Sequence, residues 1–295
     1  TTTAISITDG RAVTVGESGV ASTLAGIPFF SDSSNFSMYT HDVSGTDSTA
    51  AGNSSYGFKA MDAITTGDDN TAMGENALGA ITTGSNNVGY GKNAIQKAAS
   101  SGGNVAVGDS ALKELTYDGN SYNVAIGHNA GLSLTNAAYN TLIGGFAGDG
   151  YDTENHNIGI GLHSLGGSVA GGEYNVGVGN YTLDALTSAD QNTVVGYQSG
   201  SAVTTGGSNA FLGYQTGLAN TTGYDNVFIG NKAGLANTTG HGVIAIGQTA
   251  YDAADTEINN LAIGRDALHF NTTASGNTAV GSDSLKANTT GHTNT

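Results

Sequence analysis

Asn123-Val124-Ala125-Ile126-Gly127 is one copy of a five-residue unit, Asn-x-x-apolar-Gly, that recurs along most of this 295-residue chain. Eleven of the 13 intervals between its glycines share a 17-residue length, and the exceptions are a 19-residue interval (108 to 127) and an 18-residue interval (161 to 179). A fixed period of this length is typical of solenoids and other repeat architectures. The glycines are Gly57, Gly74, Gly91, Gly108, Gly127, Gly144, Gly161, Gly179, Gly196, Gly213, Gly230, Gly247, Gly264 and Gly281.

Each repeat combines strand-forming residues with turn residues. Counting the asparagine as position one, position two is mostly Val, Thr, Ile or Leu and position four is almost always a large apolar residue, which favours extended backbone. A turn such as Thr82-Thr83-Gly84 follows in many copies. A repeat of this length can hold two short strands and two turns, but not two helices. The sequence therefore predicts an all-β fold, a parallel β-solenoid (β-roll) of about 14 coils with a 17-residue period.

The asparagine at position one predicts a buried ladder of side-chain amides. Stacked coils would place each asparagine over the preceding one, and each amide could donate a hydrogen bond to the next. Val243 is the one interruption in the series; the alternative interpretation is that each asparagine only marks a turn. The expected ladder residues are Asn53, Asn70, Asn87, Asn104, Asn123, Asn140, Asn157, Asn175, Asn192, Asn209, Asn226, Asn260 and Asn277.

Alternation along the strand separates two faces. We expect positions two and four to point into the core and position three to point outward. Because position three is mostly Ala or Gly, this outward column would pack closely against another chain, and a trimer is the expected form; the alternative is a monomer with a face of small residues. The expected inter-chain packing residues are Ala72, Gly89, Ala106, Ala125, Gly159, Gly177, Ala245, Ala262 and Ala279.

Residues 1–52 lack the period, and the repeats occupy residues 53–295. Ile5–Thr8 and Ala12–Val15 alternate on either side of Asp9-Gly10, which predicts a β-hairpin. A solenoid needs its first coil covered, so we expect residues 1–52 to be a cap or a joint to a preceding segment, with a small binding knob as the alternative. Asn294-Thr295 opens another repeat, so the solenoid is expected to continue.

Composition excludes several classes of function. A formal net charge of −16 disfavours nucleic acid as a partner, and without cysteine there is no disulfide framework or thiolate metal site. No apolar run approaches the length of a membrane-spanning helix, so no membrane insertion is expected. His156 and His163 fall at different places in the coil, and Asp252 and Asp255 are interpreted as turn residues. We therefore expect no enzyme activity, no cofactor and no metal.

Two families resemble this sequence. The units Asn123–Gly127 and Asn277-Thr278-Ala279-Val280-Gly281 resemble the head repeats of trimeric autotransporter adhesins. The longer phrase Gly213-Tyr214-Gln215-Thr216-Gly217-Leu218-Ala219-Asn220-Thr221-Thr222-Gly223 is similar to the repeat regions of bacteriophage tail fibres. The resemblance covers residues 53–295 and implies a trimeric, parallel β-roll shaft, with a self-cleaving chaperone domain encoded downstream.

The leading functional expectation is the structural shaft of a phage tail fibre that also contributes to host attachment. It implies a location in the virion or at the cell surface, a homotrimer, and a host cell-surface receptor (glycan or protein) as partner. A bacterial surface adhesin head is the first alternative. An ice-binding solenoid is the second, although its threonines would need to lie on a strand face, whereas here they concentrate in turns.

Overall fold

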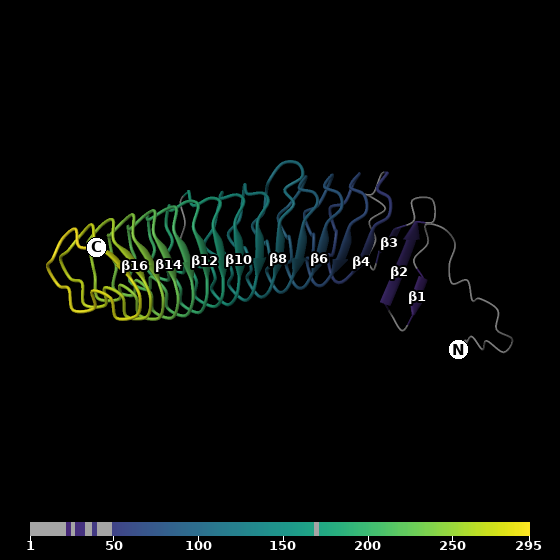
Figure 1. Ribbon diagram of the computed structural model, residues 1–295. Helices are drawn as coiled ribbons and strands as arrows, with labels where there is room; N and C mark the ends of the chain where they lie inside the picture. Colours follow the sequence, from purple (N-terminus) through teal and green to yellow (C-terminus); the bar gives the residue numbers. More distant parts are fainter. Residues whose placement is uncertain (1–21, 25–26, 33–36, 40–48, 168–170) are drawn as a thin grey trace.

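The computed structural model describes residues 22–24, 27–32, 37–39, 49–167 and 171–295, and their coils stack in one elongated row (Figure 1). Fourteen three-residue strands follow one another, one in each coil, and no helix occurs among the described residues. These strands are β4 (Ser54–Tyr56), β5 (Thr71–Met73), β6 (Val88–Tyr90), β7 (Val105–Val107), β8 (Val124–Ile126), β9 (Thr141–Ile143), β10 (Ile158–Ile160), β11 (Val176–Val178), β12 (Thr193–Val195), β13 (Ala210–Leu212), β14 (Val227–Ile229), β15 (Ile244–Ile246), β16 (Leu261–Ile263) and β17 (Thr278–Val280).

Each strand from β4 to β16 pairs in parallel with the strand of the next coil, residue for residue, as Val124 pairs with Thr141. This confirms the predicted all-β parallel solenoid. The expected second strand is absent from the described coils, which complete each circuit with turns. The physical reason lies in the backbone: positions seven and nine adopt left-handed φ angles, +57° at Asn76 and +51° at Leu78, which prevent a second extended segment.

The glycine at position five is required by close stacking as well as by conformation. Gly74 has a φ of +131°, and a Cβ placed on it would lie 2.6 Å from the carbonyl carbon of Gly91 in the next coil. Glycines at this position therefore form a backbone-to-backbone column, which explains why this position never varies over 14 repeats.

The two irregular coils keep their strands in register. β7 pairs with β8 across the 19-residue interval and β10 pairs with β11 across the 18-residue interval, each over the full length of the strand. The extra residues therefore lie outside the strands, because an insertion within a strand would exchange its two faces. In the 19-residue coil they form a loop around Gly119 that projects beyond its neighbours between β7 and β8 (Figure 1).

The predicted assignment of strand faces is wrong. In all 14 strands the central residue, position three, is buried, and positions two and four are exposed or half-exposed. Strand alternation requires this, because the asparagine at position one points inward and position three must then do the same. The residues expected between chains instead lie inside the coil: Ala72, Gly89, Ala106, Ala125, Gly159, Gly177, Ala245, Ala262 and Ala279.

The interior of each coil is filled jointly by position three and position nine. Where position three is small, position nine is large in every coil except that of β8, as in Ala262 with Leu268. In the coil of β8 both Ala125 and Gly131 are small, and a Cβ on Gly131 would lie 3.1 Å from the Leu142 side chain of the next coil. Where position three is large, position nine is glycine: a Cβ on Gly234 would lie 2.5 Å from the ring of Phe228. This exchange places one large side chain at the two positions in 13 of the 14 coils, which serves the close packing of the interior.

Three further strands precede the repeats: β1 (Ser22–Leu24), β2 (Ile27–Asp32) and β3 (Ser37–Tyr39). β1 pairs antiparallel with β2, and β2 pairs antiparallel with β3. β3 then pairs in parallel with β4, the first strand of the repeats, and the Tyr39 side chain is buried. The hairpin predicted over residues 5–15 lies outside the described residues.

Candidate interaction surface

The predicted asparagine residues all lie in the interior and form a continuous hydrogen-bonded column in most of the solenoid. The backbone nitrogen of Asn70 and its Nδ2 both donate to Oδ1 of Asn53, at 2.9 and 3.1 Å. Asn70 Nδ2 also donates to the carbonyl oxygen of Gly84, at 2.9 Å. The same pattern recurs at Asn87, so these two buried amides have partners in the neighbouring coils and across the coil.

A tyrosine hydroxyl takes the place of the missing asparagine acceptor where Val243 interrupts the column. The backbone nitrogen of Val243 still donates to Asn226 Oδ1 at 3.0 Å, but Val243 offers no side-chain acceptor to the next coil. Asn260 Nδ2 donates instead to the hydroxyl of Tyr251 at 2.9 Å, and that hydroxyl donates to the carbonyl oxygen of Glu257. The ladder is therefore a structural feature of the core and offers no group to a ligand.

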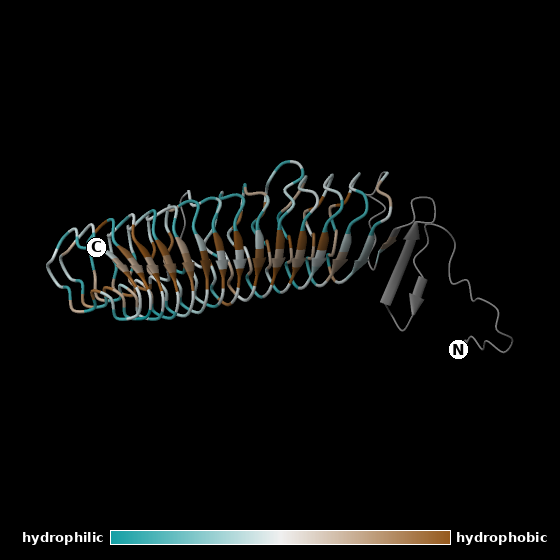
Figure 2. Cartoon of the chain, viewed as in Figure 1, coloured by the Kyte–Doolittle hydropathy of each residue, from teal (hydrophilic) through white to brown (hydrophobic). Residues whose placement is uncertain are grey.

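The surface that stands out is the outward side of the strands. We define the strand face as the side chains at positions two and four of β4 to β17. Position four is Val, Ile, Leu or Met in 12 of the 14 coils and Tyr in the other two, and half or more of the side chain is exposed at Leu212 and Val280. In Figure 2 most strands along the solenoid have the brown of hydrophobic residues, while the turns between them are more often white or teal.

No position of the strand face carries a charge, although the chain has 32 charged residues, 8 Lys+Arg and 24 Asp+Glu. Charged groups gather instead at the turns, for example the ion pair of Lys92 with Glu75 at 3.0 Å. Soluble monomers rarely expose a contiguous apolar surface of this length, and such a surface usually marks a site of association. The strand face is therefore the candidate functional site.

Stacked aromatic rings flank the strand face in the middle of the solenoid. The last position of the repeat, directly before the next asparagine, carries Tyr122, Tyr139, His156 and Tyr174 in four successive coils, with ring centroids 6.0, 4.9 and 5.1 Å apart. A second set follows the strand at position seven. It consists of Phe146, His163 and Tyr181, with centroids 4.9 and 5.7 Å apart. His156 and His163 thus belong to different columns, as their spacing predicted.

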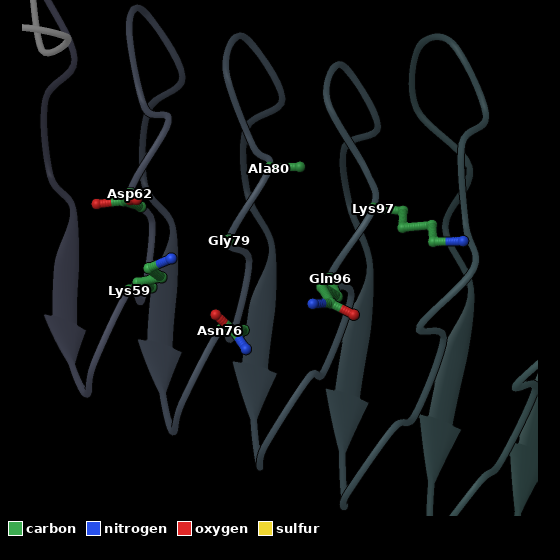
Figure 3. A pocket seen from close by; sticks show the side chains of 7 residues that line it. All are labelled: Lys59, Asp62, Asn76, Gly79, Ala80, Gln96 and Lys97. Carbon is green, nitrogen blue, oxygen red and sulfur yellow. The ribbon is translucent and has the colours of Figure 1, made fainter.

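A shallow groove crosses the turns of the first coils, away from the strand face (Figure 3). Its lining residues mix both signs of charge with neutral side chains: Lys59, Asp62, Asn76, Gly79, Ala80, Gln96 and Lys97. Lys97 already forms an ion pair with Glu114. The groove therefore has neither the charge excess nor the depth of a binding site for a small ligand.

The candidate acidic residues are engaged separately. Asp252 lies 2.6 Å from Nδ1 of His269, and burial raises the pKa of its carboxyl, while nearby His269 acts in the opposite direction. Asp255 instead accepts a hydrogen bond from the Thr238 hydroxyl. Asp68 accepts one from the backbone nitrogen of Ala51 at 2.8 Å. Within the described part of the chain, no group of three or more His, Asp or Glu side chains is placed to hold a metal ion.

Asparagines of the Asn-Thr-Thr turns have a structural role. Asn220, Asn237 and Asn271 are fully buried, and Nδ2 of Asn271 closes its turn by donating to the carbonyl oxygen of Ala274 at 2.7 Å. Their side chains are therefore not offered to solvent in the folded chain.

Comparison of this chain with models of protein families, with curated proteins and with solved structures finds no match. Among the residues described above, no helix has the length and apolar character needed to cross a membrane.

Proposed function

We propose that residues 53–295 form the shaft of a homotrimeric fibre, in which three parallel copies pack their strand faces together around a common axis. The observation that supports this most strongly is the strand face itself: 14 consecutive coils expose apolar side chains at position four, and none exposes a charge at position two or four. Covering this face removes apolar surface from water, which favours association.

The length and period of the strand face favour another copy of the chain as the partner. Fourteen strands at a spacing of about 4.8 Å extend over roughly 62 Å, and a three-residue strand is about 10 Å long, which gives roughly 600 Å² per chain. A partner that covers a surface so long and narrow must itself be long, straight and apolar along one side. A second and a third copy have these properties, and a closed ring of three leaves no strand face uncovered.

The fibre we propose is a phage tail fibre in the virion, which contributes to attachment at a host cell-surface receptor. The resemblance of Gly213–Gly223 to tail-fibre repeats supports this assignment. An adhesin head at a bacterial surface would use the same packing. Ice binding has less support, because the turn threonines use their hydroxyls within the fold, as Thr65 Oγ1 does toward the carbonyl oxygen of Thr82.

The test is to place charges on the strand face without touching the core. The variant carries Ile126→Asp, Ile143→Asp and Ile160→Asp, at position four of three successive coils. We expect the wild type to sediment at about three times 29.3 kDa and the variant at the mass of a single chain, with an unchanged β-sheet circular dichroism spectrum. A control with Glu at the turn residues Thr83 and Thr222 should remain trimeric. A monomeric wild type, or a trimeric Asp variant, would refute the proposal.

A further inference from the structure

The alternation of exposed and buried side chains continues for two residues before the strand in the central coils. Around β8, Tyr122 is exposed, Asn123 buried, Val124 half-exposed, Ala125 buried and Ile126 exposed. The last position of the repeat therefore adds an exposed side chain next to the strand. In four successive coils it carries the stacked rings of Tyr122, Tyr139, His156 and Tyr174, which we call the aromatic column.

These rings occupy positions that the local backbone disfavours for them. Their φ angles are +50°, +63°, +60° and +59°. In other coils the same position is filled mainly by residues that tolerate left-handed φ, such as Asp69, Asn86 and Gly103. Tyr122, Tyr139 and Tyr174 are nevertheless 52%, 49% and 54% exposed, so the core does not require them. Bulky side chains kept in a disfavoured conformation and half exposed indicate a role outside the single chain.

A uniform repeat leaves one property of a fibre undetermined, which is the alignment of its chains along the axis. Because every coil presents the same kind of apolar face, sliding one chain by one coil, about 4.8 Å, would preserve most of the apolar contact. The aromatic column breaks this uniformity. It ends at Gly103, where a Cβ would lie 2.6 Å from the Tyr122 ring, and at Gln191 on the other side. Its end residues, Tyr122 and Tyr174, belong to the two irregular coils.

We propose that the aromatic column sets the axial register of the fibre by packing against the aromatic columns of the other copies. This inference rests on the proposed trimer. In register, each half-exposed ring meets the rings of its neighbours; after a slip of one coil, Tyr122 of one chain would lie beside Gly103 of another or Tyr174 beside Gln191. A copy of the chain fits this surface better than a glycan, because the rings already cover one another's faces and only their edges remain open.

The absence of cysteine from the chain allows a direct measurement of register. Chains carrying Thr193→Cys are assembled together with chains carrying Ala210→Cys, at position two of the neighbouring strands β12 and β13. After oxidation, mass spectrometry compares same-residue disulfides with disulfides between residues 193 and 210. The column variant replaces Tyr122, Tyr139, His156 and Tyr174 by Asn, which is compatible with left-handed φ and should leave the fold intact.

In the wild-type background we expect same-residue disulfides to outnumber disulfides between residues 193 and 210 by about tenfold, a ratio equivalent to about 1.4 kcal/mol. In the column variant this ratio should fall at least threefold while the mass stays trimeric. A matched control with Asn at Phe146, His163 and Tyr181, stacked rings on the other side of the strand, should keep the wild-type ratio. An unchanged ratio in the column variant would overturn the inference. So would dissociation of that variant, because the rings would then supply affinity and not alignment. A wild type that fails to associate would refute the trimer itself.

Discussion

The reciprocal filling of the coil interior by positions three and nine can be tested by exchanging the two side chains in one coil. In the coil of β14, Phe228 is fully buried and stacks on Phe211 with ring centroids 4.9 Å apart, while Gly234 leaves room for the ring. The coil of β16 has the opposite arrangement, with Ala262 and Leu268. We therefore combine Phe228→Ala with Gly234→Leu, which converts one arrangement into the other.

Each single change should be damaging and the pair should not. Phe228→Ala removes a buried ring and should lower the free energy of unfolding by about 3–5 kcal/mol. Gly234→Leu forces a Cβ to within 2.5 Å of that ring. For Gly234→Leu, overpacking costs about 1–3 kcal/mol and the left-handed φ costs about 1 kcal/mol more, so the free energy of unfolding should fall by about 2–4 kcal/mol. Independent effects would sum to about 5–9 kcal/mol, whereas we expect about 1–2 kcal/mol for the double variant.

Hydrogen exchange is the appropriate assay, because stability in a solenoid is local to a coil and its neighbours. The amide of Val227 donates to the carbonyl oxygen of Val243 in the next coil, and the amide of Gly230 donates to the carbonyl oxygen of Leu212 in the preceding coil. The exchange of these two amides therefore reports on the contacts of this coil with both of its neighbours. Their protection should fall in each single variant and largely return in the double variant. Protection in the double variant that is no better than in Phe228→Ala would refute the reciprocal packing.

Three further predictions concern the core and the acid response. In denaturant titrations, Asn140→Ala should lower the free energy of unfolding by about 2–4 kcal/mol, because the ladder loses a buried donor and acceptor. The control Asn136→Ala, in an exposed turn, should change the free energy of unfolding by less than about 0.5 kcal/mol. Ala106→Glu should lower the melting temperature and the protection of the neighbouring coils even in a monomer, while Thr83→Glu should not, because position three lies inside the coil. Hydrogen bonds from Thr249 and then Lys286 lower the pKa of Asp266 to about 2, so its contribution to stability is present above about pH 4 and is lost as the pH falls toward 2. Asp266→Asn should therefore reduce the fall in melting temperature between about pH 4 and pH 2. An equal fall in the wild type and the variant would contradict this.

The 17-residue period was sufficient to predict the solenoid and its parallel stacking, because both depend on the repeat alone. The asparagine ladder followed from the same repeat. The predicted inward face was wrong because the larger apolar residues of each strand lie on the exposed side, so apolar character alone points to the wrong face. The buried amide at position one already required Ala125, and not Val124 or Ile126, to point inward.

Two other features have signals that can be seen in the sequence. Phe228 is followed six residues later by Gly234, and Ala262 is followed six residues later by Leu268, so the alternative large and small pairs can be read at a constant spacing in the sequence. Aromatic residues recur at positions 122, 139, 156 and 174 with the period of the repeat. Their exposure and their left-handed backbone, however, depend on how the turn approaches the strand, and only the three-dimensional structure provides that information.

The outward strand face is most directly tested by one pair of adjacent residues. Leu142 is buried at position three of β9, and Ile143 is at position four, on the strand face. Single cysteines are introduced at each position in turn, and the assembled protein is oxidised and run on a non-reducing gel. We expect Ile143→Cys to give disulfide-linked chains and Leu142→Cys to give none. Cross-linking of the Leu142→Cys protein but not of the Ile143→Cys protein, or of neither, would contradict association through the strand face.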